Sequence, residues 1–201
     1  MKIAAFIGSA NKNGNTAKTV KQILAGAESK GATSEIFYLC DYLIKPCTGC
    51  RYCEKKDVCK ITDDDVHILH KAIRENDAFI LGTPTYYGDI TGQFKQFVDR
   101  CYPFCKPIKH DGEKMTFGSI LPAGKPGIFV AISGSHGPEV FDSHIKVAGH
   151  CFNDLNVEHW RNILVPYTTW TPVSPEHPIM EEAFNTGVEL VETFGDKSDS
   201  K

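Results

Sequence analysis

The fold is decided by Lys2-Ile3-Ala4-Ala5-Phe6-Ile7 and by the loop that follows it, Gly8-Ser9-Ala10-Asn11-Lys12-Asn13-Gly14-Asn15-Thr16. The first six residues form an apolar run typical of a strand that is buried on both faces. After the loop, apolar residues recur at helical spacing, at Ala17, Val20, Ile23, Leu24 and Ala27. The stretch therefore predicts a strand, a loop and a helix, which is the repeating unit of α/β proteins.

The same alternation continues along the chain. Further strands are expected at 35–39, 78–82, 127–133 and 157–165. Helical stripes are expected from 66 to 73, from 94 to 101, from 141 to 152 and, through Met180, Phe184, Val188 and Val191, in the last helix. Five strands interleaved with five helices predict an α/β protein, a flavodoxin-like three-layer sandwich with a five-stranded parallel sheet, in which ligands bind at the carboxyl ends of the strands.

Composition indicates one domain. The chain has 201 residues, 41% of them hydrophobic and 23% charged, so we expect a single domain over residues 1–195 and a short flexible tail at 196–201. Residues 102–126 contain four prolines and are predicted to be an irregular insertion, of the kind that often serves as a lid or an interface.

Charge and hydropathy exclude several classes of partner. A formal net charge of −3 and the lack of a Lys/Arg-rich run argue against binding to nucleic acid or an anionic membrane. No stretch is long and apolar enough for a signal peptide core or a membrane span, so a cytoplasmic location is predicted. In that compartment the eight cysteines are better explained as metal-binding, redox or packed thiols than as disulfides. Burial as small hydrophobic residues is the default for Cys40, Cys101, Cys105 and Cys151.

The other four cysteines lie close together, in Cys47-Thr-Gly-Cys50-Arg-Tyr-Cys53-(x5)-Cys59. A structural zinc site usually takes two thiol pairs separated by a longer span. The spacing here is of the type that holds an iron-sulfur cluster, with the fourth thiolate arriving from slightly farther away. It therefore favours a cluster, with zinc, disulfides or unoccupied thiols as the alternatives.

An acidic run, Asp63-Asp64-Asp65, follows the cysteine segment. A helix is expected to begin at Thr62 or Asp63, where carboxylates suit the positive end of the helix dipole. Capping is therefore preferred to a divalent-metal site. His67 and His70 lie three residues apart on the same helix and are interpreted as surface or half-buried residues.

Three loops follow the predicted strands at the edge where ligands should bind. In the first, Ser9, Asn11, Asn13, Asn15 and Thr16 offer hydroxyl and amide groups just before a helix, which suits a monophosphate. In the second, Pro84, Thr85, Tyr86, Tyr87 and Gly88 offer aromatic rings and backbone amides that suit an isoalloxazine. In the third, Ser133, Gly134, Ser135 and Gly137 let a ligand approach the backbone, whereas His136 is interpreted as a solvent-exposed residue. Taken separately, the first two loops fit a capped polar turn and a cover for the sheet equally well.

Together, these motifs resemble the NADPH-dependent FMN reductase superfamily, and within it the iron-sulfur flavoproteins. The resemblance rests on the first loop, on Pro46–Cys50 with Ile61–Asp64, on Gly82–Tyr87 and on Gln93–Arg100. It implies noncovalent FMN, a homodimer or homotetramer, and a [4Fe-4S] cluster that exchanges electrons with FMN, often that of a neighbouring subunit.

Carried over to this sequence, the resemblance makes Cys47, Cys50, Cys53 and Cys59 the cluster ligands. It assigns the phosphate to Ser9, Asn11, Asn15 and Thr16, and the ring and ribityl chain to residues 84–88 and 133–137. Relatives typically read Ser-Pro-Arg where this chain has Ser9-Ala10-Asn11, so a phosphate-pairing arginine is missing and Lys12 is the candidate substitute.

The predicted function is that of an FMN-dependent oxidoreductase in which no protein nucleophile is catalytic. With a cluster, a low-potential donor such as ferredoxin would supply electrons, and a small acceptor such as a quinone, oxygen or peroxide would receive them. The first alternative is a cluster-free reductase of flavins, quinones or nitro compounds that takes hydride from NAD(P)H. The second is a zinc-stapled module or a non-enzymatic electron carrier on the same scaffold.

Overall fold

The computed structural model describes residues 1–110, 112 and 115–195. The tail predicted at 196–201 lies outside these residues. Five parallel strands form the central sheet, in the order β2-β1-β3-β6-β7. Their bounds are β1 (Lys2–Ile7), β2 (Thr33–Tyr38), β3 (Ala78–Pro84), β6 (Lys125–Ile132) and β7 (Val157–Val165).

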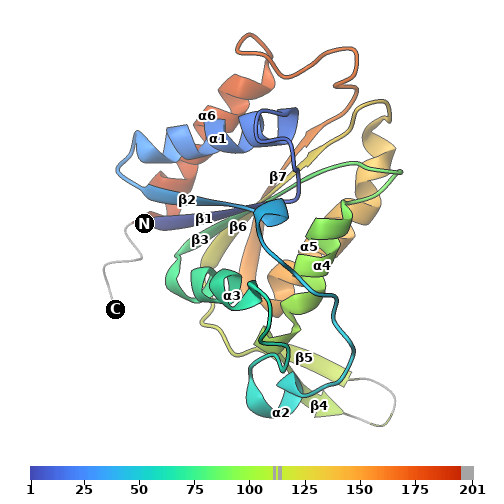
Figure 1. Cartoon of the computed structure of the whole chain (residues 1–201). Helices are drawn as coiled ribbons and strands as arrows, with labels where there is room; N and C mark the ends of the chain where they lie inside the picture. The colour runs from blue at the N-terminus through green and yellow to red at the C-terminus, as the bar shows by residue number, and fades with distance from the viewer. Residues whose placement is uncertain (111, 113–114, 196–201) are drawn as a thin grey trace.

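Helices cover both faces of this sheet (Figure 1). On one face lie α1 (Asn15–Glu28) and α6 (Ile179–Phe194), and on the other lie α3 (Val66–Glu75), α4 (Gly92–Arg100) and α5 (Phe141–Asp154). The predicted three-layer sandwich with a five-stranded parallel sheet is therefore confirmed. Strand order reverses direction at β1, whose neighbours are β2 and β3, so the crevice between β1 and β3 is where such sheets bind ligands.

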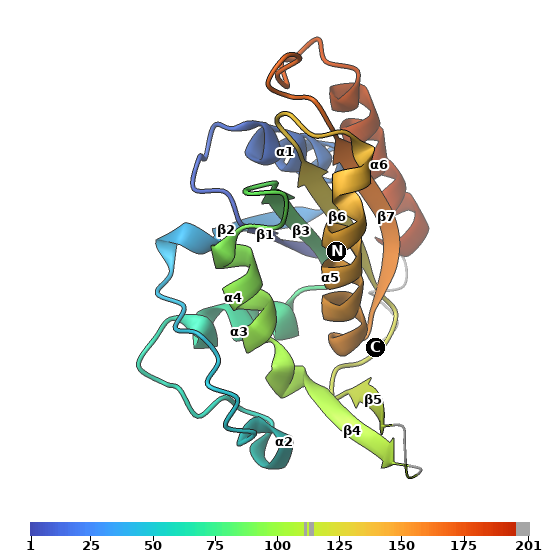
Figure 2. The same ribbon diagram turned by 90° about the vertical axis from the view of Figure 1, so that its right-hand side faces the viewer.

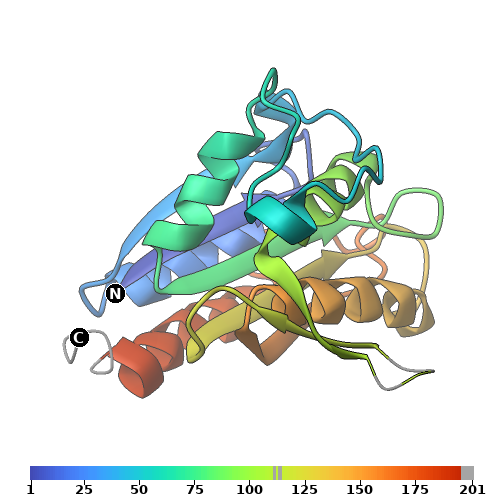
Figure 3. The same ribbon diagram turned by 90° about the horizontal axis from the view of Figure 1, so that it is seen from below.

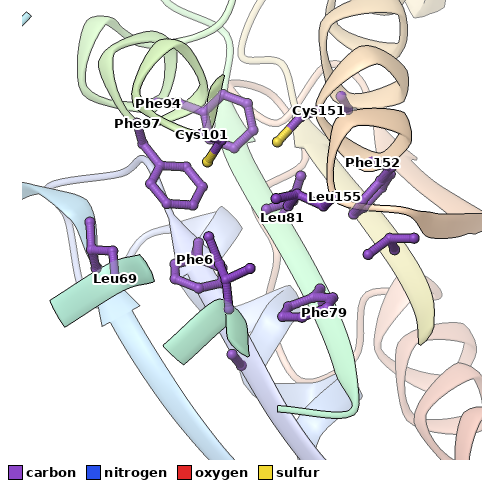
Figure 4. Packing of buried hydrophobic residues seen from close by; sticks show 14 of the residues in the cluster. Phe6, Leu69, Phe79, Leu81, Phe94, Phe97, Cys101, Cys151, Phe152 and Leu155 are labelled. Carbon is purple, nitrogen blue, oxygen red and sulfur yellow. The ribbon is translucent and has the colours of Figure 1, made fainter. Parts of the chain in front are cut away.

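Each face of the sheet has its own apolar core. The core under α3, α4 and α5 contains stacked phenylalanines, with the Phe6 and Phe97 ring centroids 4.8 Å apart. Figure 4 shows this core, which includes Cys101 just after α4 and Cys151 in α5. Hydrogen bonding between these thiols and burial raise the pKa of Cys101 well above its usual value. Cys101, Cys105 and Cys151 are buried as predicted, whereas Cys40 is half-buried.

The last helix packs on a different face from the predicted one. Its buried residues include Ala183, Gly187 and Leu190, whereas Met180 and Phe184 are only partly covered. The reason is a close crossing with α1. A Cβ atom on Gly187 would lie 1.9 Å from the carbonyl oxygen of Ile23, so the backbones meet where a side chain cannot fit.

The predicted irregular insertion at 102–126 contains regular structure. An antiparallel hairpin of β4 (Cys105–His110) and β5 (Met115–Ser119) follows a short 3-10 turn at Tyr102–Phe104. Figure 2 shows the hairpin extending away from the central sheet, on the side where the short helix α2 (Cys53–Lys56) also lies. Residues 111, 113 and 114 lie outside the described part of the chain.

Helix α3 begins later than predicted, at Val66 rather than at Thr62 or Asp63. Two of the three acidic side chains contact the preceding segment instead of capping the helix. Asp65 accepts the backbone N–H of Leu43, at 2.8 Å, and Asp63 pairs with Lys45. Only Asp64 reaches the helix start, where its Oδ1 accepts the N–H of Val66 at 3.3 Å. Among the described residues, no helix is long and apolar enough to cross a membrane.

Candidate functional site

The three predicted cofactor loops converge at the carboxyl edge of the sheet, since they follow the adjacent strands β1, β3 and β6. Backbone and side-chain hydrogen bonds join the first two. The N–H of Gly8 donates to the carbonyl of Gly82 at 2.8 Å, and the Thr91 hydroxyl donates to the carbonyl of Gly8 at 2.8 Å. Thr91 also caps α4 by accepting the N–H of Phe94 at 3.3 Å. Sequence reasoning missed this linking residue, because its role depends on a contact 83 positions away.

The first loop folds around its own side chains. Ser9 Oγ accepts the N–H of Asn11 at 3.2 Å, and Asn11 Oδ1 accepts the N–H of Asn13 at 3.0 Å. Asn15 Oδ1 accepts the N–H of Val173 at 3.2 Å, and Thr16 is buried. Helix α1 has no side-chain cap and no acidic residue in its first turn. Its first N–H groups can therefore donate to an anion such as a phosphate.

Lys12 points to a different partner. Its Nζ lies 2.6 Å from Asp41 Oδ2 and 5.1 Å from the centre of the Tyr38 ring. The hydrogen bond to Asp41 raises the pKa of Lys12. The candidate substitute for the missing arginine is therefore already engaged with a carboxylate beside the loop.

The second loop ends in a tight turn that presents two aromatic rings. Tyr86 and Asp89 exchange backbone hydrogen bonds of 2.8 and 3.2 Å, with Tyr87 and Gly88 at positive φ between them. This turn leaves Tyr86 56% exposed and Tyr87 fully exposed. At its base, Thr85 Oγ1 lies 3.1 Å from Nε2 of the fully buried His144. The turn is thus held in place at Thr85, while the rings of Tyr86 and Tyr87 remain accessible to a ligand or to another protein.

The third loop is backed by a segment that sequence reasoning did not single out. Ser133 Oγ accepts the N–H of His136 at 3.1 Å, and the carbonyl of Ser133 accepts the N–H of Thr168 at 2.9 Å. Ser135 and His136 are exposed, whereas Gly137 is buried, and a Cβ there would lie 2.5 Å from the Tyr167 hydroxyl. Tyr167 and Trp170, two exposed aromatic residues in a polar stretch, could have pointed to this segment from the sequence.

The four clustered cysteines face a single cavity. Its volume is about 50 Å³, and its walls include Cys47, Cys50, Cys53 and Cys59. Cys47 and Cys50 are exposed, while Cys53 and Cys59 are half-buried. Burial raises the pKa of Cys53, and the charges of the other three cysteines add to the rise. The thiols are therefore mutual neighbours, although no three metal-binding side chains in the described residues are close enough to hold an ion.

Arg100 forms the inner wall of the same cavity. It is 1% exposed and pairs with the buried Asp64, whose Oδ1 accepts from Nη2 at 3.3 Å. Burial opposes its charge, but Asp64 and Cys59 outweigh that effect and raise the pKa of Arg100. Burial likewise opposes the charge of Asp64, and the hydrogen bond from Arg100 keeps the pKa of Asp64 below its usual value.

The hairpin supports the cysteine segment from outside. Tyr102 donates its hydroxyl to Glu54 at 3.0 Å, and Lys106 donates to the carbonyl of Glu54 at 3.1 Å. Lys106 also pairs with Asp57, just after α2. Figure 3 shows α2 lying beside the start of the hairpin, so the hairpin and the cysteine segment support each other.

Comparison with known proteins shows which family the chain belongs to. The family model described as NADPH-dependent FMN reductase matches residues 1–160. An iron-sulfur flavoprotein of Archaeoglobus fulgidus is 30% identical over 200 residues, covering 98% of this chain and 82% of the relative. The chain belongs to the NADPH-dependent FMN reductase family.

Other relatives match over a shorter stretch. An iron-sulfur flavoprotein of Methanocaldococcus jannaschii is 37% identical over 103 residues, which is 51% of this chain and 53% of the relative. The chain thus spans about half the length of this relative in the match. Among solved structures, a flavone reductase superposes with a TM-score of 0.72 at 21% identity, covering all of this chain and 65% of that one. An archaeal flavodoxin superposes with a TM-score of 0.57 at 15% identity, over 97% and 99% of the two chains. These structural matches establish the flavodoxin-like fold.

In this member of the FMN reductase family, α4 links the two candidate sites. Its cap, Thr91, follows the second cofactor loop, and its last residue, Arg100, lines the cysteine cavity. At a rise of about 1.5 Å per residue, this helix is about 13 Å long.

Proposed function

We propose that the protein is an FMN-dependent oxidoreductase that binds FMN at the carboxyl edge of its sheet and a [4Fe-4S] cluster in the segment 47–59. The cluster would pass electrons between a low-potential donor and FMN, and FMN would deliver them to a small acceptor. Family membership supports the flavin, and the names of the curated relatives support the cluster.

The observation that carries the proposal is the wall of the cysteine cavity. Four thiols line it, which is the donor set of a cubane iron-sulfur cluster. The buried Nε of Arg100, which borders the same cavity, has no hydrogen-bond partner among the described residues. An anionic group in the cavity would satisfy both features, because thiolate-ligated clusters carry negative charge. Ligation requires the segment to draw its thiols inward.

The flavin would be held by the chain's own donors and rings. Ser9, Asn11, Asn13 and Asn15, with Thr16 at the start of α1, would surround the phosphate. Residues 84–88 and 133–137 would border the ribityl chain and the ring, with Tyr86 and Tyr87 at its edge. FMN supplies the redox chemistry, and the protein orients it and limits its access to water. No side chain needs to act as a nucleophile.

We also propose a homo-oligomer, a dimer or a tetramer, and a ferredoxin-like donor. Large exposed apolar side chains support an assembly, because a monomer rarely exposes many of them close together. Most of them lie in two groups, Leu43, Tyr52, Val58, Ile108 and Phe117 around the cysteine segment and Tyr86, Tyr87, Tyr167 and Trp170 at the flavin edge. Contact between these groups on different subunits would bring a cluster close to a neighbouring flavin. The cytoplasmic location stays a prediction.

Anaerobic purification tests the proposal directly. We expect about four irons, about four sulfides and one FMN per chain, with a brown spectrum beneath the flavin bands. Stoichiometric zinc without a visible chromophore would overturn it. Bound flavin without turnover on quinones, oxygen or peroxide would instead indicate an electron carrier.

A second candidate is a cluster-free NAD(P)H-dependent reductase of flavins, quinones or nitro compounds. The positions of the thiols in the structure favour it, since no three metal-binding side chains in the described part of the chain are within ligating reach of one ion. Rapid bleaching of the flavin bands by NADPH under anaerobic conditions, in protein with negligible iron, would support this candidate. Reduction by a ferredoxin but not by NADPH would exclude it.

A further inference from the structure

Arg100 is buried, and one of its N–H donors has no acceptor in the described part of the chain. It is the largest of the fully buried side chains. Its Nη1 donates to the carbonyl of Lys45 at 2.7 Å, and its Nη2 donates to Asp64 Oδ1 at 3.3 Å. Its Nε has no hydrogen-bond partner among the described residues. Buried N–H groups almost always have an acceptor, so we expect a further group to accept from this atom once the site is complete.

The position of Arg100 suggests which group accepts this hydrogen bond. Arg100 and Cys59 lie together in the wall of the cysteine cavity and in the wall of a neighbouring, larger cavity of about 560 Å³. Cys59 is also among the groups that raise the pKa of Arg100, so the two side chains lie near each other. Arg100 therefore stands behind the last of the four cysteines, on the side that faces the protein interior.

We propose that Arg100 is a positioning residue for the cluster, whose Nε–H donates a hydrogen bond to Cys59 Sγ when that thiolate is a ligand, and thereby raises the cluster's reduction potential. The inference rests on the proposed [4Fe-4S] cluster. Reduction adds negative charge to a cluster, so a hydrogen bond to a ligand sulfur and a nearby positive charge both favour the reduced state.

Asp64 makes this arrangement specific for arginine. It engages one end of the guanidinium, and the Lys45 carbonyl accepts from Nη1, so both terminal nitrogens are held and Nε is the nitrogen left without an acceptor among the residues that the structure describes. A lysine can keep the charge next to Asp64, but its single ammonium lacks the rigid planar fork that reaches several acceptors at once. Replacing Arg100 by lysine therefore removes the hydrogen bond to Cys59 while keeping the positive charge.

The first test compares Arg100→Lys with Arg51→Lys. Arg51 lines the same cavity but is exposed and pairs with Glu54 at 2.8 Å. In anaerobic redox titrations followed by electron paramagnetic resonance, Arg100→Lys should shift the oxidised-to-reduced ratio at least tenfold toward oxidised, about 59 mV for one electron. Arg51→Lys should shift it less than twofold. Equal potentials in all three proteins, with iron content unchanged, would overturn the inference and leave the proposed cluster intact.

The second test needs no folded variant of Arg100. The otherwise wild-type protein is labelled with [15N]arginine, and pulsed electron paramagnetic resonance of the reduced cluster measures coupling to nitrogen. A 15N coupling that persists in Arg51→Lys supports the hydrogen bond. A wild-type cluster without any such coupling contradicts it. Wild-type protein without iron would overturn the proposed cluster and this inference together, and iron analysis of the same samples distinguishes that result.

Discussion

The carboxyl edge of the sheet and the cysteine segment are built in opposite ways. At the edge, loops are tied by backbone hydrogen bonds to strands and by buried hydroxyls such as Thr83 and Thr91. The cysteine segment has one four-residue helix, two exposed and two half-buried thiols, and mainly side-chain contacts to its surroundings. The difference teaches that the carboxyl edge is ordered by the sheet itself, whereas the cysteine segment is held by side-chain contacts and by the buried Arg100–Asp64 pair behind it.

Removing a thiol should give the largest difference between the two regions. Cys53→Ser is expected to abolish iron binding, because a cluster that loses one of four thiolates loses its closed coordination. FMN content should stay at the wild-type level. Iron and flavin analysis of the purified protein checks both. Cys40→Ser, which alters a thiol outside the segment, is the matched control, and loss of flavin in Cys53→Ser alone would show that the regions are not independent.

Breaking the buried ion pair should destabilise the protein itself. Arg100→Ala leaves the Asp64 carboxylate buried and unpaired, which typically costs about 3–5 kcal/mol. Urea unfolding of the iron-free protein measures this directly. Arg51→Ala, which removes an exposed partner of Glu54, should leave the urea midpoint unchanged. Similar midpoints for both variants would mean that Arg100 does not anchor the segment.

Acid should lower the stability of the protein through His70, which contacts the backbone of Arg100. Burial lowers the pKa of His70 to about 4, and its Nε2 bonds the carbonyl of Arg100 at 2.7 Å. In the unfolded state His70 binds a proton below about pH 6.5, whereas in the folded state it stays neutral down to about pH 4. Stability should therefore fall as the pH drops from about 6.5. The total loss is about 3 kcal/mol when pH 4 is reached.

The measurement is the urea midpoint from pH 7 to pH 4. His70→Gln keeps a donor for the Arg100 carbonyl and removes the titrating ring. Its stability should therefore vary less with pH than that of the wild type over this range, and parallel curves for the two proteins would rule out His70 as the cause.

The carboxyl edge should be sensitive to one added carbon. A Cβ on Gly8 would lie 2.7 Å from Thr91 Oγ1 and 2.8 Å from Phe94 Cβ. Gly8→Ala should therefore separate the first two loops, destabilise the protein by about 1–3 kcal/mol and weaken FMN binding at least tenfold. Fluorescence titration of the apoprotein with FMN measures the affinity. At Gly92 a Cβ meets nothing within 4 Å, so Gly92→Ala should bind FMN like the wild type.

Lys12 should give the smallest effect. Because its ammonium already pairs with Asp41 on the surface, Lys12→Ala should change FMN affinity less than twofold. A tenfold loss in the same titration would mean that Lys12 leaves Asp41 to bind the phosphate and does replace the arginine of its relatives.

The sequence predicted the sheet and the five main helices because both depend on periodic apolar residues. The start of α3 and the buried face of α6 were predicted wrongly. Asp63 and Asp65 are held by Lys45 and Leu43, and the face of α6 is set by a backbone crossing at Gly187 that apolar periodicity does not record.

The role of Arg100 in the cysteine cavity could not be predicted from the sequence. The cysteines could be recognised by spacing alone, but Arg100 gains its role from a partner 36 positions earlier and a carbonyl 55 positions earlier. Such distant pairings leave no local pattern. The cofactor loops themselves stay predictions, which the FMN titrations above can test.

The hairpin leaves and rejoins the scaffold at a single point. At its neck, the N–H of Ile120 donates to the carbonyl of Phe104 at 2.9 Å. A segment whose ends already meet can be lengthened, trimmed or exchanged without rerouting any strand of the sheet. The length of the hairpin is therefore not constrained by the central sheet, and changes in it would act on the rest of the protein mainly through its contacts with the cysteine segment.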